Sequence, residues 1–278
     1  MSPLHLLSGA GNDFLALTEP AAEPSAAEIA AWCRRGLSLG ADGLFTLRRE
    51  GEAVRMEYWN ADGRPARLCL NGTRCAARLA FHLGWAAGAV EVRTGAGPIR
   101  AQEVPGTPTE IALALPAPAD PPRPVAPELE GRTWSGWIVD AGVPHFVLPW
   151  PAPLGEAPVT TLGAALRQHP GFGPGGTNVD FVRFPSPHRL EIRSFERGVE
   201  AETLACGTGV LAAVAAGVST GKLTLPVRAL TLGGFALTVA LADPGPPPLW
   251  TLAGDARLLA TLDPTPEATL LSPPPDWT

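Results

Sequence analysis

Residues 206–219 read CGTGVLAAVAAGVS, and this stretch decides the fold. After the opening turn, nearly every residue is Ala, Val, Leu or Gly. A helix that is apolar on every side has no face for water, so we expect it to be buried as a central helix. Apolar and polar residues alternate in much of the remaining chain, which predicts strands at residues 54–59, 90–93, 110–115, 189–193 and 235–239. The expected architecture is therefore strands wrapped around an apolar helix.

A second stretch has the same local character. Residues 69–80 read CLNGTRCAARLA, so Cys69, like Cys206, opens a small-residue turn that runs into an apolar helical segment. A thiol at a helix N-terminus faces unsatisfied N–H groups and the positive end of the helix dipole, both of which favour the thiolate. Two such thiols, one in each half of the chain, suggest a pair of acid/base groups that flank one substrate.

Other short motifs also occur twice. GNDF at residues 11–14 has a counterpart in GTNVDF at 176–181, and NADG at 60–63 has one in ERG at 196–198. This order predicts a divergent internal duplication with a site between the halves. A proline-dense segment at 116–124 reads as an extended linker. We expect one domain to hold residues 1–117 together with 255–278, and the other to hold residues 118–254.

Composition and charge exclude several classes of protein. The formal net charge is −6 and no basic stripe runs along the chain, so we expect no nucleic-acid partner. No apolar run approaches the roughly 18 residues that span a bilayer, and the chain does not start like a secretory signal, so we expect no membrane association. Four cysteines in 278 residues suit reduced thiols, which predicts a cytoplasmic location.

Neither a metal nor an organic cofactor is indicated. Lys222 is the single lysine beside 20 arginines, and it follows a helix in a turn typical of a C-cap rather than of a Schiff-base site. The five histidines are scattered and include no pair at i and i+4, so the sequence predicts no zinc site.

The two thiols suit one reaction in particular. Abstracting the α-proton of an amino acid without a cofactor requires oriented donors, a dry cavity and a base near neutral pH. Two thiols on opposite faces of one carbon would invert it, because one abstracts a proton while the other donates one. The competing interpretation is that both cysteines are merely small buried residues at helix starts.

The motifs resemble those of the diaminopimelate epimerase family and occur in the family order over nearly the whole chain. They lie at residues 9–14, 60–63, 69–75, 144–145, 178 and 196–209. The resemblance implies a cofactor-independent, two-base epimerase that interconverts LL- and meso-diaminopimelate for lysine and cell-wall synthesis. It also implies a mixed α/β fold with two pseudosymmetric halves, each a curved, mostly antiparallel sheet or barrel around a central helix. The active site would lie in the cleft between the halves, and the enzyme would be a homodimer.

The resemblance also assigns roles to individual residues. Cys69 and Cys206 would be the two bases, and His145 and Glu196 would lie beside the reacting centre, holding its ammonium group or tuning the thiols. The substrate-binding residues would be Asn12, Asn60, Asn71, Gly72, Asn178, Glu196, Arg197, Gly207 and Thr208. The simpler alternatives are that Asn60 only builds a turn and that Glu196 and Arg197 form a solvated ion pair.

The sequence departs from the commonest family pattern in four places. Gly43 stands where some members have a substrate-facing glutamine, Leu70 replaces a glycine beside Cys69, and Val143 replaces an asparagine before Pro144. The stretch around residues 199–201 is one residue longer. These departures leave two other functions open, a two-thiol racemase of a smaller amino acid such as proline or hydroxyproline, and a non-catalytic amino-acid-binding protein.

Overall fold

The computed structural model describes residues 3–269, and the chain divides into two compact units. Unit 1 runs up to Leu113 and resumes at Asp255, and unit 2 comprises Ala114–Gly254. The strands β8 (Glu110–Pro116) and β19 (Leu249–Asp255) pair with each other, and each crosses a unit boundary. From the sequence, the divisions are expected after residues 117 and 254. Residues 1–2 and 270–278, which belong to the expected first domain, lie outside the described part of the chain.

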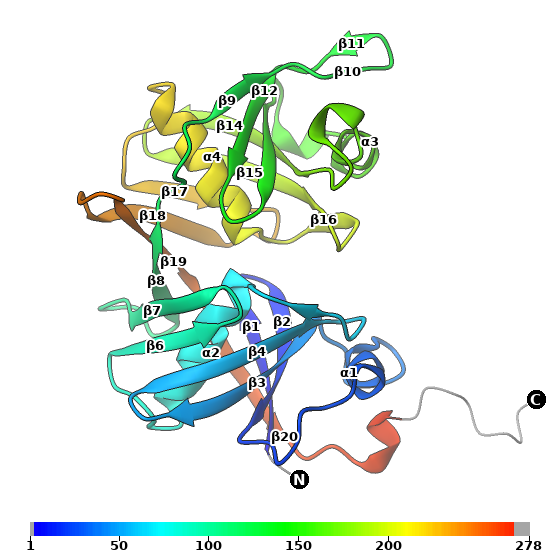
Figure 1. Cartoon of the computed structure of the whole chain (residues 1–278), viewed down its shortest axis with the longest axis vertical. Helices are drawn as coiled ribbons and strands as arrows, with labels where there is room; N and C mark the ends of the chain where they lie inside the picture. Colours follow the sequence, from blue (N-terminus) through cyan, green and yellow to red (C-terminus); the bar gives the residue numbers. More distant parts are fainter. Residues whose placement is uncertain (1–2, 270–278) are drawn as a thin grey trace, which may run out of the picture. The chain divides into compact units, whose positions relative to one another are not determined.

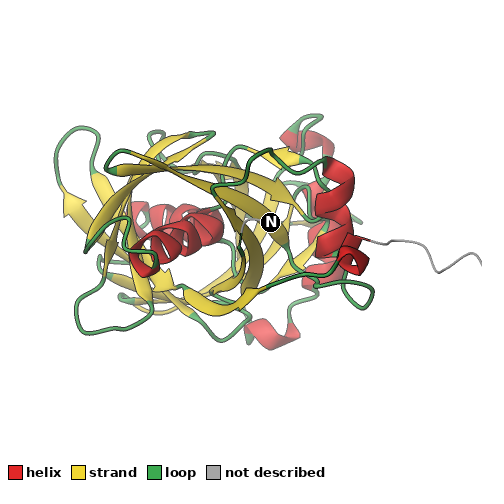
Figure 2. Ribbon diagram, turned by 90° about the horizontal axis from the view of Figure 1, so that it is seen from below, coloured by secondary structure: helices red, strands yellow, loops and turns green. Residues whose placement is uncertain are grey.

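Unit 1 is a mixed sheet whose strands surround the helix α2 (Leu70–His82), as Figures 1 and 2 show. The helix packs against strands on several sides, from β1 and β2 to β6, β7 and β20. Its residues from Leu70 to Ala77 are all buried. The strands of the unit are β1 (Leu4–Gly9), β2 (Asn12–Thr18), β3 (Gly43–Glu50), β4 (Ala53–Asn60), β5 (Pro65–Ala66), β6 (Ala89–Thr94), β7 (Gly97–Glu103) and β20 (Arg257–Leu262).

Unit 2 encloses the helix α4 (Gly207–Ser219), whose residues are buried through most of its length. The prediction of a buried central helix from the apolar stretch is confirmed. The strands are β9 (Arg123–Val125), β12 (Gly136–Asp140), β13 (Pro144–Pro149), β14 (Asn178–Ser186), β15 (Arg189–Glu196), β16 (Ala201–Thr203), β17 (Val227–Leu230) and β18 (Ala236–Asp243), with a small hairpin of β10 (Glu128–Leu129) and β11 (Arg132–Thr133). Short helical segments, η1 (Leu154–Glu156), η2 (Val159–Gly163), α3 (Ala164–Arg167) and η3 (Pro170–Phe172), join β13 to β14.

Both units use the same order of strand pairings. In unit 1, β1–β2 is antiparallel, β2–β3 parallel, β3–β4 and β4–β5 antiparallel, β4–β6 parallel and β6–β7 antiparallel. Unit 2 repeats this series from β12 to β18, with the long helix again lying between the fifth and sixth strands of the series in the chain. The mixed α/β fold class is confirmed, and the chain is an internal duplication at the level of topology.

The topology corrects one of the motif matches made from sequence. Phe14 pairs with Gly43 across β2 and β3, whereas His145 pairs with Asn178 across β13 and β14. Asn178 therefore corresponds to Gly43 and not to the GNDF motif, because strand register, rather than a short shared string, decides equivalence. Asn60 and Glu196 each end the fourth strand of their unit, so that match is consistent with the topology.

Each unit also has shorter helices besides its central one. In unit 1, Ser25 and Glu28 form a capping box at the start of α1 (Ala26–Cys33), with Ser25 N–H donating to Glu28 Oε2 at 2.8 Å. In unit 2, α3 is a single turn preceded by η2. No helix within residues 3–269 is long and apolar enough to cross a membrane.

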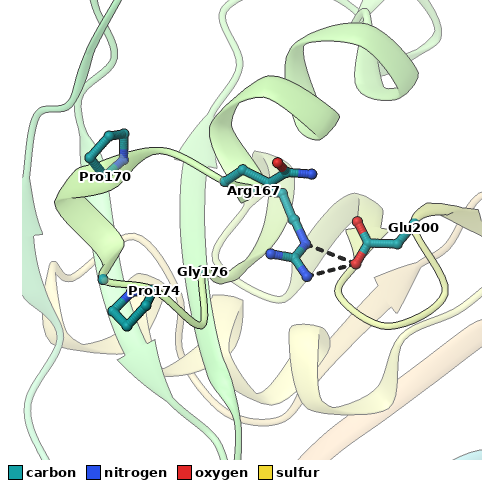
Figure 3. Close-up of a pocket in the computed structure, with 7 residues that line it drawn as sticks. Arg167, Pro170, Pro174, Gly176 and Glu200 are labelled. Atoms are coloured by element: carbon teal, nitrogen blue, oxygen red, sulfur yellow. Dashed lines mark hydrogen bonds and ion pairs between the residues drawn. The ribbon is translucent and has the colours of Figure 1, made fainter.

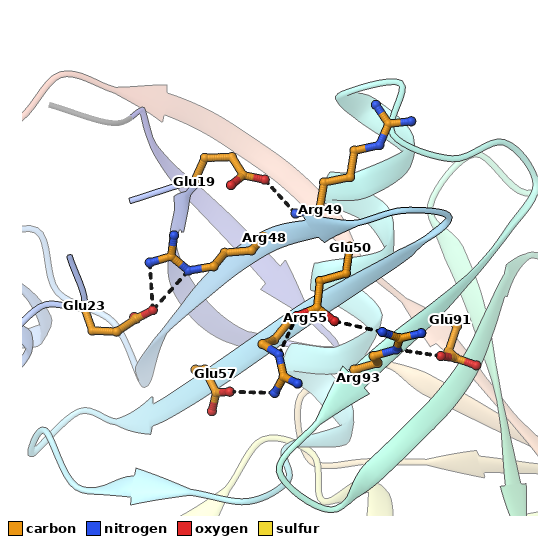
Figure 4. Close-up of polar contacts among 9 residues, drawn as sticks. All are labelled: Glu19, Glu23, Arg48, Arg49, Glu50, Arg55, Glu57, Glu91 and Arg93. Carbon is orange, nitrogen blue, oxygen red and sulfur yellow. Dashed lines mark hydrogen bonds and ion pairs between the residues drawn. The ribbon is translucent and has the colours of Figure 1, made fainter. Parts of the chain in front are cut away.

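The outer face of unit 1 carries a ladder of arginines and glutamates over β3, β4 and β6 (Figure 4). Arg55 and Arg93 both donate to Glu50, at 2.7 and 2.9 Å, and each also contacts a glutamate on its own strand. Such exposed ion pairs typically contribute less than about 1 kcal/mol each. The ladder therefore keeps this face polar and leaves the stabilisation of the unit to its core.

Candidate active site

The two cysteines occupy equivalent positions, each as the N-cap residue of the central helix of its unit. Cys69 precedes α2, and its Sγ accepts the N–H of Gly72 at 3.4 Å. Cys206 precedes α4, and its Sγ lies 3.5 Å from Thr208 Oγ1. The prediction that both thiols lie at helix N-termini is confirmed. Gly207 begins α4, so its N–H is among those that no earlier turn of the helix can satisfy.

In unit 1 a chain of hydrogen bonds holds two of the predicted substrate-binding amides. Arg74 donates to Asn71 Oδ1 at 2.6 Å, Asn71 Nδ2 donates to Asn12 Oδ1 at 2.6 Å, and Asn12 Nδ2 donates to Asp42 at 2.9 Å. A cation at one end and a carboxylate at the other fix the direction of both amides. Asn12 and Asn71 are thus brought together beside the start of α2 with their orientation set by protein groups.

Arg74 and Asp42 are the residues of this group that the sequence did not single out. The environment of Arg74 bears on the nearby thiol. Arg74 is completely buried, and burial lowers the pKa of its guanidinium. Attraction to Cys69, Cys75 and Asp255 acts in the opposite direction. A buried cation this close to a thiol favours the thiolate form of that thiol. Arg74 therefore gives Cys69 an electropositive surrounding in addition to the helix N-terminus.

Gly43 has no room for a side chain. A Cβ built there would meet the Trp59 carbonyl oxygen and two atoms of the Tyr58 ring system at 2.7 Å. The Tyr58 hydroxyl donates to Asn60 Oδ1 at 3.3 Å. The tyrosine thus fills the space at position 43 and supplies a polar group next to Asn60, another of the predicted substrate-binding residues.

We expect Gly43→Ala to lower the free energy of unfolding by about 1–3 kcal/mol, the usual cost of forcing extra volume into a packed core. Urea denaturation of the variant and the wild type measures the difference. Gly155→Ala is the matched control, because a Cβ at the exposed Gly155 meets nothing within 4 Å. Equal destabilisation of the two variants would show that the Tyr58 contact does not limit position 43.

In unit 2 the side chain of His145 is completely buried and held from both sides. Its Nδ1 lies 2.7 Å from Asp180 Oδ2, and its Nε2 lies 3.0 Å from Thr208 Oγ1. Asp180 is also completely buried and accepts a hydrogen bond of 2.6 Å from Ser194 Oγ. The imidazole is therefore oriented between a carboxylate on β14 and a hydroxyl in the first turn of α4.

Cys206 differs from the expectation for a thiol at a helix start. Its pKa is raised well above the usual range, chiefly by burial and further by the nearby carboxylates of Glu196 and Asp180. These effects outweigh the helix N-terminus, so Cys206 is a thiol in this structure rather than a thiolate. Burial also raises the pKa of Glu196, while hydrogen bonds from Thr203 and Cys206 oppose that shift.

Asn178, the first residue of β14, is tied to the turn after β15 that carries Arg197. Asn178 Oδ1 accepts the backbone N–H of Arg197 at 2.8 Å, and Asn178 Nδ2 donates to the Pro144 carbonyl at 3.0 Å. Arg167 donates twice to Glu200, at 2.9 and 2.7 Å, beside a hollow of about 740 Å³ (Figure 3). Glu200 lies in the segment that is one residue longer than the family pattern. The longer loop is thereby anchored to the helix α3.

The predicted site residues form two groups, one in each unit. Unit 1 contains Asn12, Asn60, Cys69, Asn71 and Gly72, and unit 2 contains His145, Asn178, Glu196, Arg197, Cys206, Gly207 and Thr208. Sequence reasoning missed Asp42 and Arg74 in unit 1 and Asp180, Ser194 and Thr203 in unit 2. Asp180 had no distinct signal, because a charged residue between the apolar Val179 and Phe181 is the ordinary alternation of a strand. Among residues 3–269, no three His, Cys, Asp or Glu side chains are grouped so that they could hold a metal ion.

Comparison with solved structures identifies the fold. A PhzF-family phenazine biosynthesis protein from Enterococcus faecalis superposes with a TM-score of 0.70, covering 94% of this chain and 98% of its own, at 17% identity. A probable proline racemase from Agrobacterium radiobacter gives a TM-score of 0.67, covering 97% and 96%, at 15% identity. The protein thus has the duplicated α/β fold shared by these two groups of proteins.

Sequence comparison identifies the family within that fold. Residues 5–110 and 137–257 match the profile of diaminopimelate epimerase. The diaminopimelate epimerase of Chlorobaculum tepidum is 38% identical over 242 residues, covering 85% of this chain and 92% of the relative, and that of Azoarcus is 34% identical over 260 residues, covering 88% and 92%. The chain belongs to the diaminopimelate epimerase family and is an isomerase that acts on a small amino-acid substrate.

Proposed function

We propose that this enzyme interconverts LL- and meso-diaminopimelate by a two-base mechanism in which Cys69 and Cys206 act on opposite faces of one α-carbon. The observation that carries the proposal is the equivalent placement of the two thiols at the N-termini of α2 and α4. The reaction requires neither a metal nor an organic cofactor, and it serves lysine and cell-wall synthesis. We also propose a cytoplasmic location and a homodimeric state, which gel filtration with light scattering would test.

The two thiols have different surroundings, which supports different roles for them in the resting enzyme. Cys69 lies beside the buried cation Arg74, whereas Cys206 lies beside the carboxylates of Glu196 and Asp180. The thiol that is ionised when the substrate binds abstracts a proton, and the other thiol donates one to the opposite face. The inverted product leaves the enzyme with the two protonation states exchanged.

The remaining residues hold the substrate while the proton moves. The N–H groups of Gly72, Gly207 and Thr208 at the two helix starts bind the carboxylate next to the reacting carbon, where the helix dipoles also favour negative charge. Asn60, Asn178 and Arg197 bind the distal amino-acid end, and Asn12 and Asn71 orient the substrate through amide groups. His145 and Glu196 lie next to the reacting centre.

The test is incorporation of solvent deuterium into the substrate. Incubation of the purified enzyme with LL-diaminopimelate in D2O should place deuterium at the α-carbon as meso product appears, measured by mass spectrometry after chiral separation. A binding protein without catalysis would give no label. Label in proline or hydroxyproline but none in diaminopimelate would replace the proposed substrate by a smaller one.

A further inference from the structure

The hydrogen bonds around Cys206 form a continuous line that the two-base mechanism does not use. Cys206 Sγ lies 3.5 Å from Thr208 Oγ1, which lies 3.0 Å from His145 Nε2. On the far side of the ring, His145 Nδ1 lies 2.7 Å from Asp180 Oδ2. All four residues belong to unit 2, and His145 and Asp180 have no exposed side-chain surface.

The partners of each group fix the direction in which protons point. The carboxylate of Asp180 already accepts the hydroxyl of Ser194 at 2.6 Å, so it can only accept the Nδ1–H of His145. In the neutral imidazole the Nε2 is then an acceptor, and it takes the hydroxyl proton of Thr208. The lone pairs of the Thr208 oxygen are left to accept the S–H of Cys206.

We propose that this line is a proton relay, in which the Thr208 hydroxyl carries the proton of Cys206 to His145 and Asp180 is the positioning residue that holds His145 ready to receive it. The inference rests on the proposed function, since it explains how Cys206 becomes a base.

The transfer is balanced without any further reactant. The S–H bond of Cys206 breaks as the proton moves to Thr208 oxygen, while the hydroxyl proton of Thr208 moves to His145 Nε2. A thiol and a neutral imidazole become a thiolate and an imidazolium, and the Thr208 hydroxyl is regenerated. The Asp180 carboxylate stabilises the imidazolium, which is the form that stores the proton.

The surroundings of Cys206 show why such a relay is needed. Burial and the negative charges of Glu196 and Asp180 keep its pKa high, so the thiol does not ionise on its own near neutral pH. The charged or titratable groups around His145 are Asp180 on β14, Glu196 on β15 and Cys206 at the start of α4. Glu196 interacts with Cys206 and is the competing destination for its proton.

Alkylation of Cys206 by iodoacetamide tests the relay without turnover. The background is Cys69→Ala, and peptide mass mapping identifies the modified cysteine. We expect Thr208→Val to slow alkylation of Cys206 at least about tenfold, and Thr208→Ser, which keeps the hydroxyl, to restore the rate. Both variants retain the backbone N–H at position 208 that is proposed to bind substrate.

Asp180→Asn separates the relay from simple electrostatics, because the two predict opposite changes in the rate at which Cys206 is alkylated. Removing a nearby negative charge would by itself lower the pKa of Cys206 and speed alkylation. The relay predicts slower alkylation, because the imidazolium loses the carboxylate that stabilises it. Thermal unfolding of each variant checks that the fold is retained.

The relay is overturned if folded Thr208→Val alkylates as fast as its parent, or if folded Asp180→Asn alkylates faster. Loss of alkylation in Glu196→Gln with no change in Thr208→Val would also overturn it, since the proton would then pass directly to Glu196. None of these outcomes depends on epimerisation, so failure of the relay and failure of the proposed function are distinguishable.

Discussion

Replacement of either Cys69 or Cys206 by alanine should reduce the epimerisation of LL-diaminopimelate at least about a hundredfold. A positioned acid or base typically contributes 10²–10⁴ to a rate, and no other group in the first turn of α2 or α4 can take the place of the missing thiol. The rate of formation of meso product, followed by chiral chromatography at saturating substrate, measures the loss. Circular dichroism of each variant establishes that the fold is intact.

The matched control is Cys33→Ala, which should keep most of the activity. Cys33 lies at the end of α1, and burial together with Asp13 and Asp42 raises its pKa to about 12. Such a thiol is not ionised at neutral pH and is a packing residue. A folded Cys69→Ala or Cys206→Ala variant with more than about a tenth of wild-type turnover would remove that cysteine from the mechanism.

Arg197→Lys should weaken turnover of diaminopimelate by about tenfold or more, which corresponds to at least about 1.4 kcal/mol of transition-state binding. The side chain of Arg197 is proposed to bind the distal carboxylate of the substrate, and a guanidinium can do so through two parallel hydrogen bonds that a lysine ammonium cannot reproduce. The backbone N–H of Arg197 is held by Asn178 Oδ1, and lysine leaves this contact in place. Comparison of kcat/KM between the variant and the wild type measures what the Arg197 side chain contributes to transition-state binding.

Arg189→Lys controls for the loss of a guanidinium, because Arg189 is exposed at the start of β15, the strand that ends just before Arg197. Its kcat/KM should match that of the wild type. The wild type should not racemise lysine or proline, because neither has the second α-amino-acid end. If Arg197→Lys leaves kcat/KM for diaminopimelate unchanged, or if the wild type turns over proline, the protein is better explained as a racemase of a smaller amino acid.

Much of the fold was predictable because it follows from local patterns. The all-apolar helix after Cys206, the alternating strands and the capping box at Ser25 each depend on neighbours in sequence. The equivalence of Cys69 and Cys206 was visible for the same reason. The error in matching Asn12 with Asn178 arose because strand equivalence depends on pairing between distant segments, such as His145 with Asn178.

The residues that orient the predicted site residues could not be found from the sequence, for a similar reason. Arg74 lies three residues from Asn71 in a helix whose polar residues would normally face water, and only the enclosing strands make it buried. Asp180 and Ser194 come from two different strands, and their contact depends on the antiparallel pairing of β14 with β15. Sequence supplied the residues of the site but not the partners that orient them.

The placement of β20 bears on the order in which the protein folds during synthesis. Leu4 of β1 pairs with Leu262 of β20, whereas the corresponding partner of β12 is β9, which precedes it in the same unit with only the β10–β11 hairpin between them. Unit 2 is continuous in sequence and can close as soon as residues 114–254 have left the ribosome. Until β20 follows, β1 keeps an unpaired edge that is open to incorrect partners. The unit that is translated first is therefore the last to be completed.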